Sequence, residues 1–354
     1  MSTKSQQPIV VLQYDQLPQC RVVNIKSGQS VLRVEGDTDE AFLSTRSIST
    51  YPLLPCGEKD GDPIADKLYV QVHRNRAIMA VADGCNWGRR PVMAACDAIA
   101  AFAQYFDQRQ SEIQTLHDAG HYLLRAFCEA HNKIIQGKSD IWEAGTTTLL
   151  GGLVMELEDD SGAPPRWGFL CASVGDCKAF LLSMKRREAT DVTSGNRFNI
   201  TDTRDPGGRL GPYIGQGWPD LRNLKLYFTF CEENDIAVIV SDGVHDNLDP
   251  VMLGKLPAEL NINAHGWEEL SHEELLKTKS MYMKKLLEEI VFGSGRVAPS
   301  EITKKLIDHC AKVTHRSRDY MEKFPNKKQP VDYREYPGKM DHTTCVSFQI
   351  GRSK

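Results

Sequence analysis

The sequence lacks several patterns that mark common classes of protein. No apolar run approaches the roughly 20 residues of a transmembrane helix, and residues 1–8 are polar, without the apolar segment of a secretory signal. No G-x-G-x-x-G pattern and no phosphate-binding P-loop occurs. The net charge is −4 and the lysines and arginines are scattered, so no basic region is available for nucleic acid. These absences argue against membrane, nucleotide-binding and nucleic-acid-binding proteins.

The cysteines form no pattern of a metal site or a disulfide framework. There are ten of them, no two in a C-x-x-C pair, and several lie inside apolar helical or strand patterns: Cys96, Cys128, Cys171 and Cys345. This usage is typical of reduced, mostly buried thiols in an intracellular protein. We therefore expect a cytoplasmic location, with the nucleus also open.

Three aspartates stand at the ends of apolar runs. Asp83 and Asp242 each follow such a run and precede a glycine, and Asp341 stands just before the β-rich residues 343–350. Short apolar runs bounded by Asp and Gly predict buried strands, so each would place a carboxylate at a strand end. Gathered carboxylates repel one another unless a cation lies among them, and oxygen ligands favour Mg²⁺ or Mn²⁺. The alternative is that each Asp-Gly pair simply marks a turn.

The order of five short motifs favours the metal site over simple turns. They are Asp83-Gly84, the G-T-T-T of residues 145–148, the S-V-G-D of residues 173–176, the S-D-G of residues 241–243 and the D-H-T-T of residues 341–344. From about residue 60 to the C-terminus, this order resembles the metal-dependent Ser/Thr protein phosphatase family called type 2C. Residues 205–212 and 241–250 are similar to a divergent animal phosphatase-like branch of that family.

The predicted elements agree with the fold that the resemblance implies. Apolar periodicity predicts helices over residues 89–106, 113–135, 271–292 and 299–320, and strands over residues 67–72, 146–157 and 166–173. A tight turn at residues 174–176 predicts a hairpin between residues 166–173 and 177–182. We expect an α+β fold, an antiparallel β-sandwich flanked by α-helices on both sides in four αββα layers. Residues 1–59 would form an N-terminal extension packed on or leading into a phosphatase domain of residues 60–354.

The resemblance implies a centre with two Mn²⁺ or Mg²⁺ ions. Asp83 would bridge both, the Gly84 carbonyl would serve one, and Asp242 and Asp341 would hold the other. Asp176 matches an aspartate for a third, weaker ion, against the alternative that it only shapes a turn. Paired cations activate a water for in-line attack on phosphorus, so no covalent phosphoenzyme is needed.

The chain also departs from the family pattern. Asp66 matches the second member of an acidic pair whose first member falls on Ala65. Where an arginine would grip phosphate, the stretch before Asp66 offers only Lys59, which lacks a bidentate grip. Cys85 replaces a histidine that many members use to protonate the leaving group, and a thiol is a poor acid at neutral pH. His342 replaces an asparagine and supplies either a hydrogen bond or proton beside the site, or only structural support.

Two classes of function follow. The leading one is an Mn²⁺- or Mg²⁺-dependent phosphatase of phosphoserine and phosphothreonine, a monomer acting on phosphoproteins. Residues 199–216, too rich in Gly and Pro for a helix or strand, would lie beside the metals, with Arg204 and Arg209 as substrate contacts or as anchors of the loop. The alternative is a pseudophosphatase that keeps the fold as a binding or scaffolding module.

Overall fold

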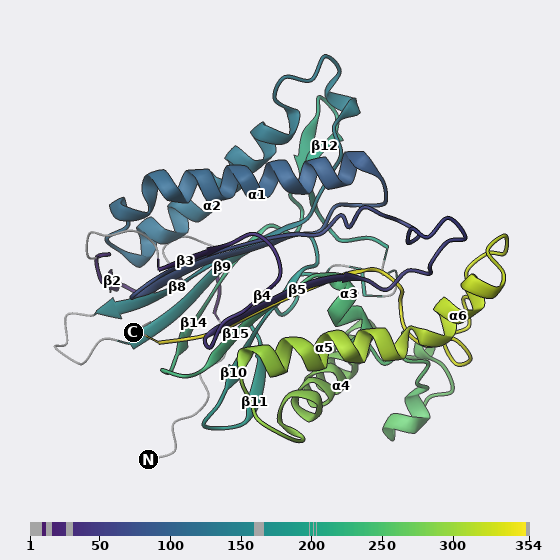
Figure 1. Cartoon of the computed structure of the whole chain (residues 1–354). Coiled ribbons are helices and arrows are strands. Elements are labelled where there is room, and N and C mark those ends of the chain that lie inside the picture. Colours follow the sequence, from purple (N-terminus) through teal and green to yellow (C-terminus); the bar gives the residue numbers. More distant parts are fainter. Residues whose placement is uncertain are drawn as a thin grey trace.

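In the computed structural model, two antiparallel sheets are stacked face to face and helices cover both outer faces (Figure 1). The structure describes residues 9–11, 16–25, 31–158, 166–197, 199–200, 202 and 204–351. Every pairing among the described strands of the two sheets is antiparallel. The predicted α+β sandwich with flanking helices is therefore confirmed.

The first sheet has the strand order β1-β14-β9-β8-β7-β6-β3, with β2 paired to β8. Its strands are β1 (Ile9–Val11), β2 (Arg21–Val22), β3 (Leu32–Val34), β6 (Lys67–His73), β7 (Arg76–Ala82), β8 (Leu149–Glu158), β9 (Arg166–Val174) and β14 (Lys225–Cys231). The second sheet has the order β11-β10-β15-β16-β5-β4. Its strands are β4 (Thr38–Asp39), β5 (Leu43–Ser49), β10 (Lys178–Ser183), β11 (Glu188–Asp191), β15 (Ile236–Val240) and β16 (His342–Gln349).

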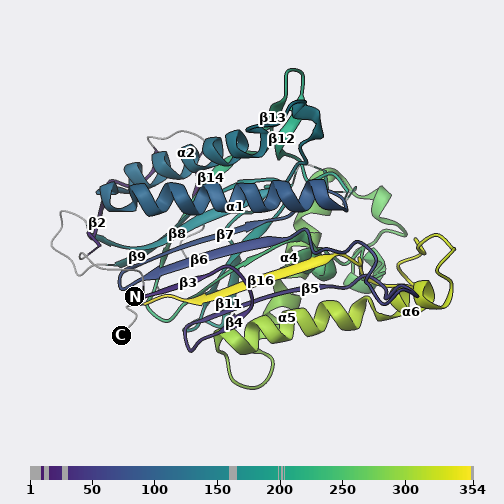
Figure 2. The same ribbon diagram turned by 45° about the horizontal axis from the view of Figure 1, so that its top comes forward.

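Two helices cover each sheet, as Figure 2 shows from a second direction. Those on the first sheet are α1 (Arg89–Arg109) and α2 (Leu116–Ile135), and those on the second are α4 (His272–Phe292) and α5 (Pro299–Val313), followed by α6 (His315–Lys323). The predicted helices match these bounds within a few residues, except that residues 299–320 divide into α5 and α6. Among the described residues, no helix is both long and apolar enough to cross a membrane.

Strand β7, the apolar run that ends just before Asp83, is buried on both of its faces. Ile78, Ala80 and Ala82 pack on the side of α1 and α2, whereas Met79 and Val81 pack between the sheets. Because both faces of the strand are buried, its sequence is apolar without alternation. The strand is therefore held on both sides up to the residue before the first predicted metal ligand.

The predicted hairpin between residues 166–173 and 177–182 is wrong. Strand β9 pairs with β8 and β14 in the first sheet, whereas β10 pairs with β11 and β15 in the second. The turn between them contains Gly175 with φ +97°, and a Cβ there would lie 2.5 Å from the side chain of Thr148. A tight turn signal is the same whether the chain returns to its own sheet or crosses to another. Here it crosses, and it leaves Asp176 at the crossing.

Two other segments differ from their predicted form. Within residues 199–216, β12 (Arg209–Ile214) pairs with β13 (Trp218–Asp220), so this region is partly a two-stranded ribbon with an irregular register. The glycines and prolines that suggested a loop are tolerated because the ribbon is short and bulged. Before residue 60, β3 and β5 contribute strands to the two sheets. Residues 1–8, 12–15 and 26–30 lie outside the described part, and the boundary at residue 60 stays a prediction.

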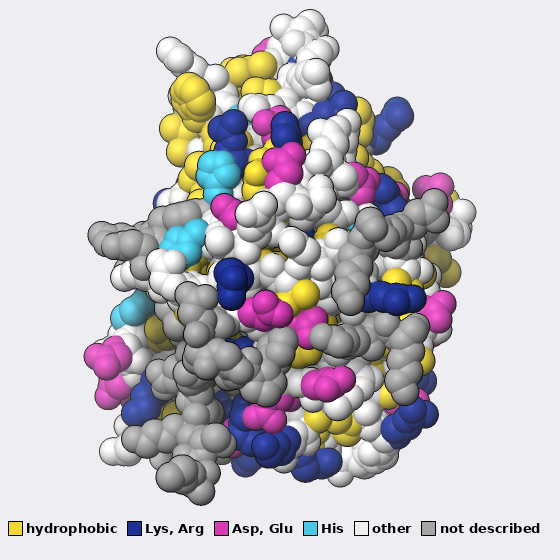
Figure 3. All heavy atoms as spheres, turned by 90° about the vertical axis from the view of Figure 1, so that its left-hand side faces the viewer, with side chains coloured by type: hydrophobic (Ala, Val, Ile, Leu, Met, Phe, Trp, Pro, Cys, Tyr) yellow, Lys and Arg dark blue, Asp and Glu magenta, His cyan; other side chains and the backbone are white. Residues whose placement is uncertain are grey.

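The face at the left of Figure 1, seen directly in Figure 3, has no single-sign surface among the side chains drawn in colour. Blue Lys and Arg side chains and magenta Asp and Glu side chains are interspersed there. Charge is concentrated instead at the other end of the sheets, near α3 (Asp242–His245), where several ion pairs are buried.

Candidate metal centre

Carboxylates from both sheets meet at one end of the sandwich. Asp83 follows β7 of the first sheet, Asp176 lies in the crossing turn, and Asp242 begins α3 after β15 of the second sheet. Each offers a carboxylate oxygen, and these oxygens all lie within 4.8 Å of one another. The structure thus brings together three of the residues that the sequence analysis placed in a metal centre.

The negative charges of these buried carboxylates repel one another, and a bound cation would relieve that repulsion. Burial, and then repulsion by Asp242 and other carboxylates, raises the pKa of Asp83 well above its ordinary value. Burial also raises the pKa of Asp176, although Arg197 opposes the shift. The Asp242 Oδ1 atom is buried without a hydrogen-bond partner among the described residues. An all-oxygen donor set of this kind suits a hard divalent cation such as Mg²⁺ or Mn²⁺.

Lys339, which was not predicted from the sequence, pairs with Asp242 and with two further carboxylates. The Lys339 Nζ atom lies 2.5 Å from Asp242 Oδ2, 2.9 Å from Asp341 Oδ2 and 3.1 Å from Asp246 Oδ2. Burial would lower the pKa of Lys339, but these three carboxylates together raise it well above its ordinary value. In an extended segment, residues two apart point to the same side, so the spacing of Lys339 and Asp341 was the available signal.

Arg197 forms ion pairs with both Asp176 and Asp246. Arg197 Nη2 lies 2.6 Å from Asp176 Oδ2, and Nη1 lies 2.5 Å from Asp246 Oδ1. Although burial opposes it, Arg197 and then Lys339 hold the pKa of Asp246 well below its usual range. Asp246 was not predicted from the sequence either. Its position four residues after Asp242, on one face of a helical turn, was the signal that could have found it.

Two further side chains, Asp66 and Tyr51, position Asp242 and Asp341 through hydrogen bonds. Asp66 is buried, burial raises its pKa to about 7, and its Oδ2 accepts a hydrogen bond from Ser241 Oγ at 2.7 Å. The Tyr51 hydroxyl donates to Asp341 Oδ1 at 3.1 Å and accepts from Trp87 Nε1 at 2.9 Å. Asp66 therefore fixes the turn before Asp242, and Tyr51 fixes Asp341.

The departures from the family pattern have distinct environments. His342 Nδ1 accepts a hydrogen bond from the Ala65 amide at 3.2 Å, and burial lowers the pKa of His342 to about 4. A neutral ring bonded to backbone favours the structural interpretation of His342. Burial raises the pKa of Cys85 to about 11, so its thiol is a weaker acid than an exposed cysteine.

A cleft of about 460 Å³ is lined by four of these carboxylates and by several other side chains: Asp83, Asp176, Asp242, Asp341, Arg204, Arg209, Tyr333 and Cys85. Arg204 is 87% exposed and pairs with Asp202 at 2.9 Å, whereas the Arg209 guanidinium lies over the Tyr213 ring at 4.3 Å from its centre. Lys59 is not among the residues that line this cleft, and its ammonium donates to the Ser49 carbonyl. The predicted loop residues reach the cleft, and the predicted lysine does not.

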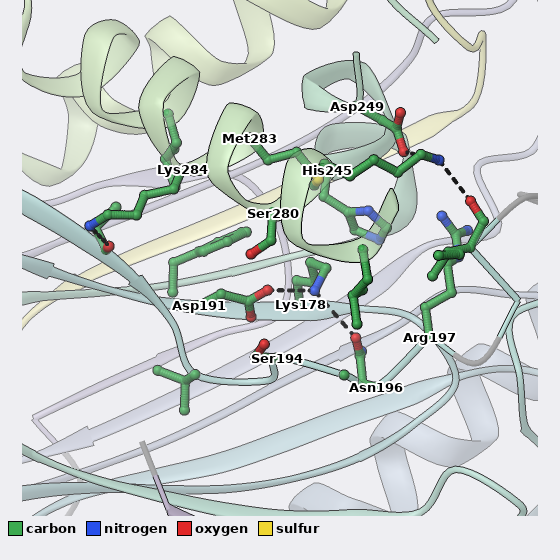
Figure 4. Close-up of a pocket in the computed structure, with 18 of the residues that line it drawn as sticks. Lys178, Asp191, Ser194, Asn196, Arg197, His245, Asp249, Ser280, Met283 and Lys284 are labelled. Carbon is green, nitrogen blue, oxygen red and sulfur yellow. Dashed lines mark hydrogen bonds and ion pairs between the residues drawn. The ribbon is translucent and has the colours of Figure 1, made fainter. Parts of the chain in front are cut away.

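A second cavity, of about 650 Å³, lies between α4 and strands β10 and β11 (Figure 4). Its buried cations are already paired: Lys178 lies 2.6 Å from Asp191, and Lys279 lies 2.9 Å from Asp249. Arg197 lines this cavity while it holds Asp176, which lines the cleft. The Arg197 guanidinium therefore lies between the two hollows.

Comparisons with known proteins bear on the fold of the chain and on its relatives. No family model matches the chain. The chain is 34% identical over 203 residues to a PP2C-like domain-containing protein of Drosophila melanogaster, a match that covers 55% of this chain and 27% of that relative. The match thus spans about a quarter of the relative's length.

Solved structures show the same fold. The photosystem II phosphatase PBCP is 16% identical with a TM-score of 0.51, over 88% of this chain and 99% of that one. The S. agalactiae serine/threonine phosphatase is 13% identical with a TM-score of 0.50, over 87% and 100%. The chain has the PP2C phosphatase fold, and its predicted resemblance to a divergent animal PP2C-like branch is confirmed.

Proposed function

We propose that this chain is a metal-dependent phosphatase that hydrolyses phosphoserine and phosphothreonine in proteins. The observation that carries the proposal is the cluster of Asp83, Asp176 and Asp242, with carboxylate oxygens within 4.8 Å at the end of a PP2C-type sandwich. The unpartnered Oδ1 of Asp242 supports it, because a buried carboxylate oxygen without a donor is costly unless a ligand satisfies it. A cytoplasmic site of action is part of the same proposal.

The residues of the cleft would have different roles in metal binding and substrate binding. Asp83, the Gly84 carbonyl, Asp242 and Asp176 would hold Mn²⁺ or Mg²⁺, with Asp341 beside them. When bound, a divalent cation lowers the pKa of water and neutralises charge on a phosphoryl group. Lys339 fixes the orientation of the Asp242 and Asp341 carboxylates and adds positive charge to the cleft that it lines. Arg209 lines the same cleft and is the candidate for contact with the phosphate or with acidic residues of the substrate.

A second function has specific support. Ala65 and Cys85 stand where the family resemblance implies an acidic residue and a proton donor. The ammonium of Lys339 and the guanidinium of Arg197 already neutralise several of the carboxylates. These features favour a pseudophosphatase that uses the cleft to bind a partner without turnover.

The experiment that separates the two is phosphate release from phosphopeptides by the purified chain, with and without saturating Mn²⁺. We expect metal-dependent release that falls more than about 100-fold in Asp83→Asn, since even residues behind the ligands contribute 10- to 100-fold. Asp118→Asn, which alters a cap of α2 far from the cleft, is the matched control and should behave as the native chain. If neither the native chain nor Cys85→His releases phosphate, the binding function replaces the enzyme.

A further inference from the structure

Lys339 pairs with the two carboxylates that the family resemblance assigns to one of the metal ions, Asp242 and Asp341. A cation held by both Asp242 and Asp341 must contact both carboxylates, and the Lys339 ammonium already does so at 2.5 and 2.9 Å. A divalent ion held by the same two carboxylates would lie close to this fixed positive charge. The two cations would repel each other strongly in this buried setting.

Hydrogen bonds to a neighbouring side chain fix the backbone of Lys339, and this holds its ammonium near the carboxylates. Its amide donates to Asn247 Oδ1 at 2.9 Å, and its carbonyl accepts from Asn247 Nδ2 at 3.0 Å. Asn247 follows Asp246 directly, and its Nδ2 also donates to the carbonyl of Gly243 at 2.8 Å. The lysine is thus tied to the turn that carries Asp242 and Asp246, and its side chain is only 18% exposed.

The other half of the cluster keeps room for a cation. Among the described residues, no ion pair reaches the Asp83 carboxylate, which lines the cleft. Six carboxylates gather here: Asp66, Asp83, Asp176, Asp242, Asp246 and Asp341. In the described part of the chain, Lys339 and Arg197 form ion pairs with four of them, and His245 Nδ1 lies 3.3 Å from Asp246 Oδ1. A single divalent ion at the Asp83 side therefore still reduces an excess of negative charge.

We propose that the Lys339 ammonium takes the place of one of the two divalent cations, so that the chain holds a single ion, at Asp83, Asp176 and Asp242. This inference rests on the proposed function in that Asp83 and Asp242 are taken as metal ligands. The lysine pairs with Asp242, Asp341 and Asp246 whether or not metal is present. Metal binding then follows a simple one-site curve rather than the stepwise filling of a dinuclear centre.

The test counts Mn²⁺ ions per chain by calorimetry and by electron paramagnetic resonance on the full chain. We expect one ion in the native chain, with the six-line spectrum of an isolated Mn²⁺. Lys339→Ser, which removes the charge and opens space, should bind two ions, and the spectrum should broaden through coupling between them. Lys339→Met removes the charge at similar volume and provides a second variant if the serine variant unfolds.

The matched control is Lys178→Met, which removes another buried, ion-paired lysine outside the carboxylate cluster and should leave the count at one. Two ions in the native chain would overturn the inference, as would an unchanged count in folded Lys339→Ser and Lys339→Met. Phosphate release is measured separately. A chain that binds one ion but releases no phosphate retains this inference and loses the proposed function.

Discussion

On the first-sheet side of the cluster, Asp83 has no ion pair among the described residues, whereas on the second-sheet side Asp242, Asp246 and Asp341 share the Lys339 ammonium. Asp83 follows strand β7, and Asp242 and Asp341 flank the ends of β15 and β16, so carboxylates on both sides lie next to strand ends. They differ in whether the chain itself supplies the counter-charge. A site that needs an outside cation stays open to ligands, and one that carries its own cation is fixed when the protein folds.

The same comparison explains the opposite pKa shifts of neighbouring aspartates. Burial and repulsion raise the pKa of Asp83, whereas Arg197 and Lys339 overcome burial and lower the pKa of Asp246. Both carboxylates meet the cost of desolvation, so the shifts differ because only Asp246 has cationic partners. The first side is therefore the one expected to respond to metal, and the second is expected to respond to loss of its basic residues.

The largest effect is expected when the second side loses Arg197. Arg197→Met leaves Asp176 and Asp246 without the guanidinium that pairs with both, and removing one partner of a buried pair costs about 3–5 kcal/mol. Denaturant unfolding of metal-free protein measures this loss. The control is Arg222→Met, because Arg222 is half-exposed in its pairs with Asp205 and Asp220 and should cost about 1 kcal/mol or less. Equal losses in the two variants would show that the buried network contributes no more than a surface pair.

A smaller effect is expected when a proton donor is added on the open side. Cys85 lies two residues after Asp83 and lines the cleft, but burial raises the pKa of its thiol to about 11. Cys85→His should raise the rate of phosphopeptide hydrolysis by roughly 100-fold if protonation of the leaving group limits turnover. Cys85→Ala is the control and should keep the native rate, since a neutral thiol contributes little. A rate in Cys85→His equal to that in Cys85→Ala would show that another step limits the reaction.

Much of the fold was predictable because it follows from periodicity. The apolar runs before Asp83 and Asp242 are strands buried on both faces, and the helices bury a single stripe, which the spacing of apolar residues reveals. The turn at Gly175 was not predictable in this way. Its sequence specifies a sharp reversal, but pairing partners far away in the chain decide which sheet the next strand joins.

The sequence predicted most of the residues around the cleft, but not the cations that pair with the carboxylates, nor Asp246. Strand-end aspartates followed by glycine are visible in the sequence, and their order matched a known family. Lys339 and Arg197 were missed because a basic residue near an acidic one is common on protein surfaces, and only the three-dimensional structure shows that these two are buried against several carboxylates. Tyr51 was missed because residues 51–57 have the composition of a turn-rich link, although its hydroxyl reaches Asp341.

The smallest effect concerns the wall of the cleft on the open side, where Arg204 and Arg209 differ from each other. Arg204 is 87% exposed and satisfied by Asp202, so Arg204→Ala should change kcat/KM by no more than about twofold. Arg209 is partly buried over the Tyr213 ring, and loss of one charge-assisted contact of about 1.5–3 kcal/mol should lower kcat/KM by roughly 10- to 100-fold on phosphopeptides with acidic neighbours. Arg209→Lys keeps the charge without the planar fork and should fall between Arg209→Ala and the native chain. A panel of phosphopeptides with acidic, neutral and basic flanks measures these differences, and native activity of both alanine variants on the whole panel would remove residues 199–216 from substrate choice.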